Sequence, residues 1–243
     1  MVFQLAMGWR HLLFANYPVD PGVVDAHLPD ALAVDTFDGD AWLSVVPFTN
    51  VDVRPRGLPA VAGIDLPELN LRTYVTCRGE PGVYFFSLDA QGVSSVLGAR
   101  IFHHLPYYSA RVRLERDDRG GIRFESRRRH PGDRPVHYAA TYRPDGEPFE
   151  SHEDPRAAFL TERYRFYTQA SDDSVRYATV AHEPWTLAPA TVVTETNTLF
   201  EANGFDRPSA SPVCYYSPGV DVHASASKQW TAEGTRPPAE RLT

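Results

Sequence analysis

Strand-length segments in which apolar and polar side chains alternate constrain the fold of this chain more than any other feature. Residues 68–77 are the clearest case, because Leu69, Leu71 and Val75 alternate with Glu68 and Arg72. Successive side chains of a β-strand point to opposite faces, so this segment predicts a strand with one apolar and one polar face. In an isolated antiparallel strand the polar face would lie in water. In a closed barrel it would line the lumen as a binding wall.

Turn residues divide much of the remaining chain into similar segments. Asp38-Gly39-Asp40 and the run 117–121 predict two hairpins. Aromatic and β-branched residues, which favour strands, are frequent between such turns. Further strands are therefore expected at Leu32–Phe37, Ala41–Phe48, Val83–Leu88, Tyr108–Arg116, Ile122–Arg128, Val136–Tyr142, Val175–His182 and Val213–Tyr216.

Three helices are expected beside these strands. Asp20-Pro21 and Asp154-Pro155 each combine a capping aspartate with a proline suited to the first helical turn. Gln91–Phe102 carries apolar residues at helical spacing. The predicted helices are residues 21–27, residues 91–102 and a segment from 155 towards 164. The sequence therefore predicts a mainly β (α+β) chain, with one domain over 1–230 and a frayed tail over 231–243.

Composition limits the class of partner. The formal net charge of −7 disfavours binding to nucleic acid or to an anionic membrane. No apolar run approaches the roughly 18 residues that a membrane-spanning helix needs, and residues 1–10 lack the features of a signal peptide. Cys77 and Cys214 lie among apolar neighbours and are expected to be buried, reduced thiols. A cytoplasmic protein without nucleic-acid or membrane partners is expected.

Several common catalytic and cofactor motifs are missing from the sequence. It contains no GxGxxG after a strand, no GxxxxGK[ST], no GxSxG and no HExxH. We therefore expect no cofactor and no metal, with a metal site assembled from distant histidines as the alternative. The only lysine is Lys228, close to the predicted tail. Schiff-base chemistry in the core, which requires a lysine amine, is therefore excluded.

Two of the expected helices carry charged residues on faces that otherwise look apolar. Arg100 lies on the apolar stripe of residues 91–102, where a guanidinium needs a buried carboxylate or must reach out to solvent. In the third helix, i, i+3, i+4, i+7 spacing gives one face to Phe159, Glu162, Arg163 and Phe166. These charges predict either structural ion pairs, such as Arg100–Glu162 or Glu68–Arg163, or groups that bind an anion.

Several dispersed motifs agree, in order, with one known family. They are Trp9–Phe14, Glu68–Val75, Gly82–Ala90, Ala99–Tyr108, Phe159–Tyr164 and His182–Trp185. Together they resemble the uncharacterised YqjF-like family, which looks like a branch of the acetoacetate decarboxylase-like superfamily. The resemblance extends over nearly the whole chain, to about Asp221. It implies a mostly β, cone-shaped closed barrel around a pocket, with a few peripheral helices.

The resemblance also implies where a site would lie. In the decarboxylase a glutamate lies on an early strand, and two lysines follow a Phe-Pro pair. Glu68 matches that glutamate, Leu105-Pro106 matches the Phe-Pro pair, and Tyr107 and Tyr108 fall where the lysines belong. A phenol forms no iminium, but it can donate a hydrogen bond or act as a general acid. Glu68 and Tyr107 are therefore the expected acid–base pair.

The remaining candidates follow from the same pocket. The expected ligand-binding residues are Arg72, Arg100, Tyr108 and Arg163, and the candidates for structural ion pairs are Glu162 and Asp89. The expected ligand is a small organic acid or oxo-acid, handled by a lyase, isomerase or hydratase without a Schiff base. Two alternatives stay open: a non-catalytic binding or sensing barrel, and a purely structural role for the charged motifs. A homo-oligomer is expected, by default a two-fold dimer.

Overall fold

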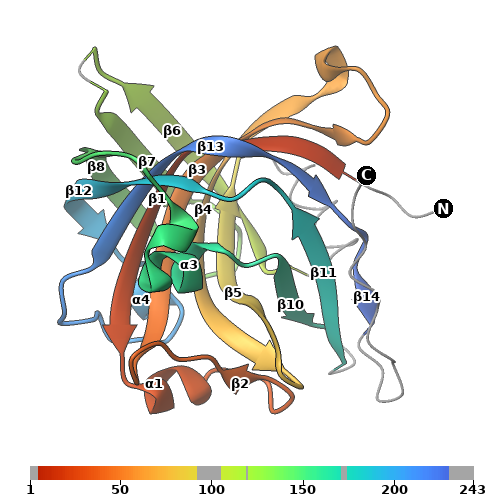
Figure 1. The fold of residues 1–243 in the computed structure, drawn as a ribbon, viewed down its shortest axis with the longest axis vertical. Coiled ribbons are helices and arrows are strands. Elements are labelled where there is room, and N and C mark those ends of the chain that lie inside the picture. Colours follow the sequence, from red (N-terminus) through yellow and green to blue (C-terminus); the bar gives the residue numbers. More distant parts are fainter. Residues whose placement is uncertain (1–4, 92–104, 119, 171–173, 230–243) are drawn as a thin grey trace.

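The computed structural model describes residues 5–91, 105–118, 120–170 and 174–229, and strands dominate them (Figure 1). The strands are β1 (Leu5–Val19), β2 (Ala33–Val34), β3 (Ala41–Pro55), β4 (Ile64–Cys77), β5 (Glu80–Ala90), β6 (Tyr107–Arg116), β7 (Ile122–Arg128), β8 (His137–Pro144), β9 (Phe149–Glu150), β10 (Arg165–Gln169), β11 (Val175–Ala181), β12 (Thr186–Asn197), β13 (Val213–Ala224) and β14 (Lys228–Gln229). The helices are α1 (Pro21–Asp25), α3 (Pro155–Thr161) and α4 (Leu199–Ala202), with 3₁₀ turns η1 (Ala60–Ala62) and η2 (Ser151–Glu153). The predicted mainly β class is confirmed.

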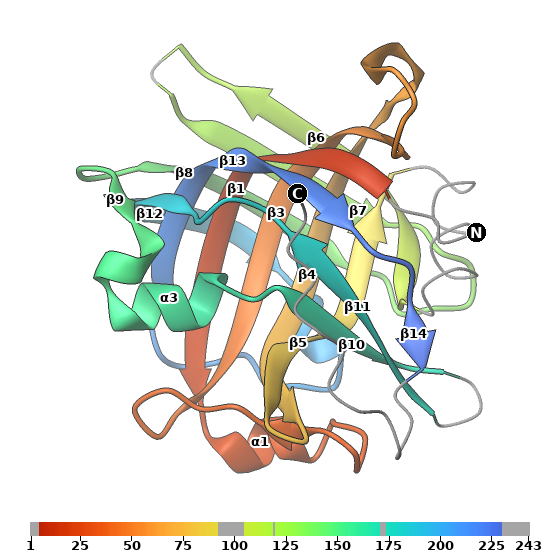
Figure 2. The same cartoon turned by 45° about the vertical axis from the view of Figure 1, so that its right-hand side comes forward.

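The strands of the described ranges form one strongly curved sheet (Figure 2). Its pairings lead from β5 through β6, β7, β8, β12, β13, β1, β3 and β4 back to β5. A shorter route leads from β5 through β10 and β11 to β13. The pairs of β5 with β6 and with β10 are parallel, and both lie on these return routes. The central strands β1, β3 and β4 therefore have other strands facing them on both sides.

Both faces of the three central strands are buried as a result. On one face Leu13, Leu43 and Leu71 pack in a core that includes buried residues of β6, β7 and β8. On the other face Phe14 and Tyr74 belong to a second core, which includes residues of α3. Nearly continuous apolar sequences such as that of β3 are typical of strands covered on both faces. Glu68 and Asn70 of β4 therefore lie inside the molecule, and Arg72 on the same face is half-buried.

The strand predictions are confirmed for most segments, and the hairpin of β6 and β7 pairs as expected. At residues 38–40 the predicted turn is present, with positive φ at Asp38 and Gly39 (54° and 88°). The partner predicted for the preceding strand is wrong, because β2 pairs with β4 and not with β3. Strands β1 and β12 were not predicted from the sequence. In β1 the alternation of polar and apolar residues is weak, because this strand is buried on both faces.

The helix predictions are correct at their starts. The Asp20 side chain accepts a hydrogen bond from the Gly22 amide at 2.8 Å, and Asp154 caps α3 in the same way. The expected helical face that ends at Phe166 is wrong, because α3 ends at Thr161 and Phe166 belongs to β10. Strand pairing to β5 and β11 outweighs the helical spacing there. The predicted helix at Gln91–Phe102 lies outside the described residues, except for Gln91.

The described helices are short, and α1 is at the lower end of the view in Figure 1. Within residues 5–91, 105–118, 120–170 and 174–229, no helix has the length and apolar character to cross a membrane.

A buried ion pair fixes the junction where β5 meets β6 and β7. The Arg128 guanidinium donates two hydrogen bonds to the carboxylate of Asp89, at 2.6 and 3.0 Å. The side chains are 3% and 0% exposed, respectively. The ring of Tyr108, the residue paired with Asp89 in β6, lies 3.8 Å from the Arg128 guanidinium carbon. The Asp89 carboxylate therefore neutralises the buried Arg128 guanidinium.

Removing the Asp89 carboxylate is expected to destabilise the protein strongly. Asp89→Ala leaves a buried guanidinium without its counter-ion, which costs about 3–5 kcal/mol of unfolding free energy. Urea unfolding monitored by fluorescence measures this change. Arg123→Gln, which breaks the exposed pair between Arg123 and Glu195, is the matched control and should change stability little. Equal effects of the two substitutions would contradict the structural role of the buried pair.

Candidate functional site

A cavity of about 130 Å³ lies on the side of the central strands that faces β10 and β11. Its wall includes residues of β1, β3, β4 and β5, together with Phe166 of β10 and Val180 of β11. Further contributions come from Tyr107 at the start of β6 and from the segments next to α3 and β12. The cavity thus lies between the central strands and the strands β10 and β11.

Most of the cavity wall is apolar and aromatic. The rings that line it are Trp9, Phe14, Phe48, Phe85, Phe166 and Trp185. Trp9 and Trp185 stack with nearly parallel planes and a centroid separation of 6.0 Å. A backbone irregularity at His11, whose φ is 57°, lets Trp9 and Leu12 face the same side of β1. An apolar wall with a few placed polar groups is typical of small-molecule sites.

Glu68 is the most unusual polar group of this wall. It is only 4% exposed, and its Oε2 accepts hydrogen bonds from the Tyr107 hydroxyl at 2.9 Å and from Asn50 Nδ2 at 3.1 Å. Burial raises the pKa of Glu68 to about 7, although the hydrogen bonds from Tyr107, Asn70 and Asn50 oppose that increase. A carboxyl with this pKa exchanges its proton readily near neutral pH.

Tyr107 is hydrogen-bonded to Glu68, the residue with which the sequence predicts that it pairs. Its hydroxyl donates to the carboxylate, and both side chains line the cavity. Burial and the neighbouring charge of Glu68 raise the pKa of Tyr107 above its ordinary value. The phenol therefore stays protonated at neutral pH and acts as a hydrogen-bond donor.

Arg72 supplies positive charge at another point of the same wall. One terminal nitrogen donates to the Leu160 carbonyl oxygen at 3.2 Å, and the guanidinium carbon lies 5.4 Å from the centre of the Phe14 ring. Among the described residues, Arg72 has no carboxylate within 4.0 Å. Its buried Nε has no hydrogen-bond partner there either. Buried donors without a partner are rare, so an anion at this point would satisfy Arg72.

His182 is a further polar residue of the wall. Its Nδ1 lies 2.7 Å from the Glu183 carbonyl oxygen, which makes Nδ1 the protonated nitrogen and leaves Nε2 as an acceptor. The ring packs against Trp185 and Tyr164 with centroid separations of 4.9 and 4.7 Å. Burial lowers the pKa of His182, and the charge of Arg72 also lowers it. His182 is therefore neutral at pH 7.

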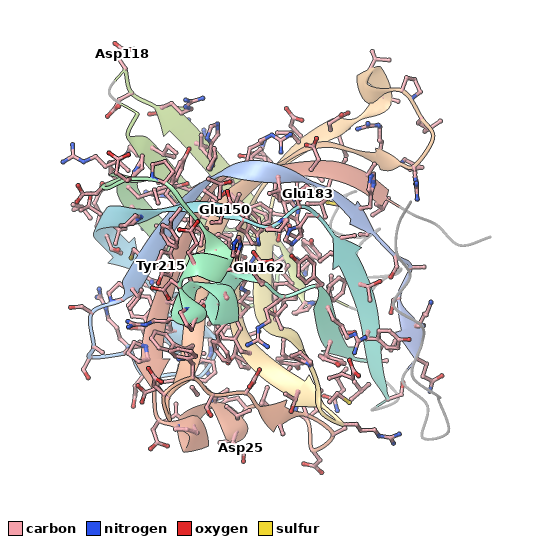
Figure 3. The ribbon with its side chains drawn as sticks, in the orientation of Figure 1. Asp25, Asp118, Glu150, Glu162, Glu183 and Tyr215 are labelled. Carbon is pink, nitrogen blue, oxygen red and sulfur yellow. The ribbon has the colours of Figure 1, made fainter. Side chains whose placement is uncertain are left out.

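Arg163 does not form the pair with Glu68 suggested by the sequence, and the pair suggested between Glu162 and Arg100 lies outside the described residues. Arg163 lines the cavity but binds Asp35 through an ion pair of 2.7 Å, and not Glu68. Glu162 lies at the end of α3 (Figure 3), where its carboxylate accepts hydrogen bonds from the Trp185 amide and from Ser151. That carboxylate fixes the chain at the end of α3. Arg100 lies outside the described residues.

Tyr108 occupies a different place from the one expected. The described cavity wall does not include it, because Tyr107 and Tyr108 point to opposite faces of β6. Tyr108 instead packs on Arg128, beside the ion pair with Asp89. The structure therefore separates the two tyrosines that occupy the positions of the decarboxylase lysines.

The sequence analysis missed Asn50, His182 and the aromatic wall. Asn50 comes near the end of a long apolar strand, and no motif marks its approach to Glu68 from β3. His182 begins a motif that carried the family resemblance, and that was its only signal. Asn70, by contrast, shares the polar face predicted for residues 68–77. Within the described residues, no group of three or more His, Cys, Asp or Glu side chains is arranged to hold a metal ion.

Comparison with known proteins connects this geometry to a family and a fold. Residues 6–221 match the family described as "Uncharacterized conserved protein". The chain is 40% identical over 231 residues to the "Uncharacterized protein YqjF" of Bacillus subtilis (strain 168), covering 95% of this chain and 94% of that protein. This similarity extends over nearly the full length of both proteins, as the order of the sequence motifs predicts.

Two solved structures share the architecture at low sequence identity. Acetoacetate decarboxylase from Legionella pneumophila subsp. pneumophila str. Philadelphia 1 is 13% identical with a TM-score of 0.61, covering 93% of this chain and 87% of that chain. The enduracididine biosynthesis enzyme MppR complexed with pyruvate is also 13% identical, with a TM-score of 0.64, covering 94% and 90% of the two chains. The acetoacetate decarboxylase-like fold predicted from the motifs is confirmed.

The raised pKa of Glu68 predicts a specific pH dependence of stability. In the unfolded chain the carboxyl titrates near its ordinary value of 4.5, and in the folded chain near 7. The folded state therefore binds the proton more tightly than the unfolded chain. The contribution of Glu68 to the free energy of unfolding is greatest below pH 4.5 and decreases as the pH rises to 7. The slope approaches about 1.4 kcal/mol per pH unit in this window.

Denaturant unfolding at pH 5, 6, 7 and 8 measures this contribution as the difference between the wild-type protein and Glu68→Gln. The variant lacks the carboxyl, so its stability should rise relative to the wild type as the pH rises from 5 to 7. A difference that stays constant over this range would contradict the burial of an ionisable Glu68.

Proposed function

The chain belongs to the YqjF-like family of uncharacterized conserved proteins, and on that premise we propose that its cavity binds a small oxo-acid and promotes proton transfer on it. Glu68 exchanges the proton, Tyr107 stabilises the oxygen that gains charge, and Arg72 holds the carboxylate. The observation that carries this proposal is the buried Glu68, whose pKa is raised to about 7 beside a hydrogen-bonded phenol. Perturbed carboxyls in apolar cavities are typical of acid–base sites.

The proposed reaction is enolisation of a ketone. The Glu68 carboxylate removes a proton from the carbon next to the carbonyl group, and the electrons of the C–H bond form a C=C bond. The carbonyl π electrons move to oxygen, to which the Tyr107 hydroxyl donates its single proton as a hydrogen bond once it releases Glu68. Return of the proton from Glu68 to the same or another carbon restores the carboxylate. The cycle consumes no co-reactant and fits an isomerase. A hydratase would in addition add water to the ligand or release it, and a lyase would release a leaving group from the enolate.

A Schiff base is not part of this proposal. Lys228, the only lysine of the sequence, lies on β14 and is exposed. Tyr107 occupies the position that corresponds, by the motif resemblance, to a lysine of the decarboxylase. The phenol supports oxyanion stabilisation in place of electron withdrawal by an iminium. The proposed reaction therefore differs from acetoacetate decarboxylation, while the fold is shared.

Two further observations support an oxo-acid as the ligand. Arg72 Nε and Asn70 Oδ1 are buried polar atoms of the cavity wall without a hydrogen-bond partner among the described residues. The carboxylate of an oxo-acid would satisfy Arg72 Nε, whereas Asn70 Oδ1 requires a donor, such as a hydroxyl group, elsewhere on the ligand. The structural neighbour MppR is complexed with pyruvate, which is an oxo-acid. Arg163 is assigned a smaller role than Arg72, because Asp35 already neutralises it.

A non-catalytic binding or sensing protein is the second candidate function. Glu68 Oε2 already accepts two hydrogen bonds, from Tyr107 and Asn50. If neither bond breaks when a ligand enters, Glu68 shapes the pocket and transfers no proton. Binding without proton transfer for every ligand tested would favour this second function.

The experiment combines binding and isotope exchange on a panel of oxo- and hydroxy-acids of different length. Calorimetry measures affinity, and proton NMR in D₂O measures exchange at the carbon next to the carbonyl. Glu68→Gln should leave binding nearly intact and slow the exchange by about 10²–10⁴-fold. Arg72→Gln should weaken binding by about 10–100-fold, the value of lost charge-assisted hydrogen bonds.

Arg163→Gln is the matched control for Arg72→Gln. It also removes one guanidinium from the cavity wall, but from a residue that Asp35 already pairs. Its effect on affinity should be several times smaller. Equal losses in the two arginine variants, or no binding of any acid to the wild-type protein, would contradict the proposed anion site.

A further inference from the structure

The acid–base pair and the anion site lie apart along one strand. Glu68 and Arg72 share the cavity face of β4, and their Cα atoms are about 13 Å apart at the rise of an extended strand. The register with β3 is unbroken from Phe48–Glu68 to Ser44–Arg72, so no bulge shortens this separation. The two groups therefore cannot both contact one small functional group.

The two side chains also do not converge. The Arg72 guanidinium donates to the Leu160 carbonyl oxygen, which also accepts a hydrogen bond from Tyr74, the next residue on this face of β4. Its carbon lies 5.8 Å from the centre of the Tyr74 ring. The Glu68 carboxyl is held by Tyr107 and Asn50. Arg72 thus extends towards α3, away from Glu68.

Mostly apolar surface separates the two polar ends, with Asn70 as the polar side chain between them on β4. Phe48, Phe85, Phe166 and the stacked pair of Trp9 and Trp185 line the same cavity. Its volume of about 130 Å³ is close to the roughly 150 Å³ of an apolar protein cavity that holds benzene. The whole cavity therefore has room for about one six-membered ring, so an apolar body between Glu68 and Arg72 is at most of that size.

We infer that the ligand is an elongated oxo-acid in which an apolar body of ring size separates the carboxylate from the reacting carbonyl group. The carboxylate binds Arg72, the apolar body lies against the aromatic wall, and the carbonyl group reaches Glu68 and Tyr107. A short 2-oxo acid such as pyruvate, whose two groups are adjacent, can reach only one end. This inference rests on the proposed function and narrows its substrate class.

Three commercial acids serve as probes. In 4-acetylbenzoate a benzene ring separates the carboxylate from an enolisable acetyl group, and 4-ethylbenzoate has the same shape without the carbonyl. Pyruvate has both groups side by side. The full-length protein should bind 4-acetylbenzoate at least tenfold more tightly than pyruvate, by calorimetry. It should bind 4-ethylbenzoate about fivefold more weakly than 4-acetylbenzoate, the cost of one lost hydrogen bond.

Two variants fix the orientation of the probe. Arg72→Gln should weaken binding of both benzoates by at least tenfold. Glu68→Gln should abolish deuterium exchange at the acetyl methyl group of 4-acetylbenzoate with little loss of affinity. If pyruvate binds as tightly as 4-acetylbenzoate, depends on Arg72 and exchanges through Glu68, the elongated ligand is wrong while the proposed function stands. If 4-acetylbenzoate binds independently of Arg72, the orientation is overturned. If no acid binds, the proposed function itself fails.

Discussion

The double burial of the central strands is the constraint on which the rest of the structure depends. Because the middle segments of β1, β3 and β4 are covered on both faces, most of their side chains enter one of two interiors. One interior is the apolar core that includes Leu13, Leu43 and Leu71. The other contains the cavity, and the alternation of β4 directs Glu68, Asn70 and Arg72 into it. The polar face of a strand, which water would normally solvate, thereby becomes the wall of a site.

Buried charged groups are paired in one part of the molecule and separated in another. At the junction of β5, β6 and β7, Asp89 and Arg128 satisfy each other completely, which is what a structural ion pair requires. In the cavity, Glu68 has hydrogen bonds but no cation, and Arg72 has no carboxylate among the described residues. Burial consequently raises the pKa of Glu68, and Arg72 has no counter-ion in the part of the chain that the structure describes. A protein that only needed stability would gain by pairing or removing these groups, so their separation supports the proposed ligand.

The sequence was sufficient for the fold class and for one wall of the site, because both depend on local alternation. The polar row of β4 and the positions of Glu68 and Tyr107 follow from that alternation and from the motifs. The errors occur where distant contacts decide the outcome. Helical spacing suggested that Arg163 belonged to a longer α3, but the helix ends at Thr161 and Arg163 pairs with Asp35 from the chain near β2. Asn50 could not be predicted, because its role depends on the register between β3 and β4.

The proposed function depends on Glu68 as a buried carboxyl that exchanges a proton near neutral pH. Carbon NMR of protein labelled at the glutamate side-chain carboxyls measures its titration directly, with Glu68→Gln identifying the signal. We expect a titration midpoint at about pH 7 for Glu68. A midpoint near 4.5, the ordinary value of a solvated glutamate, would contradict it.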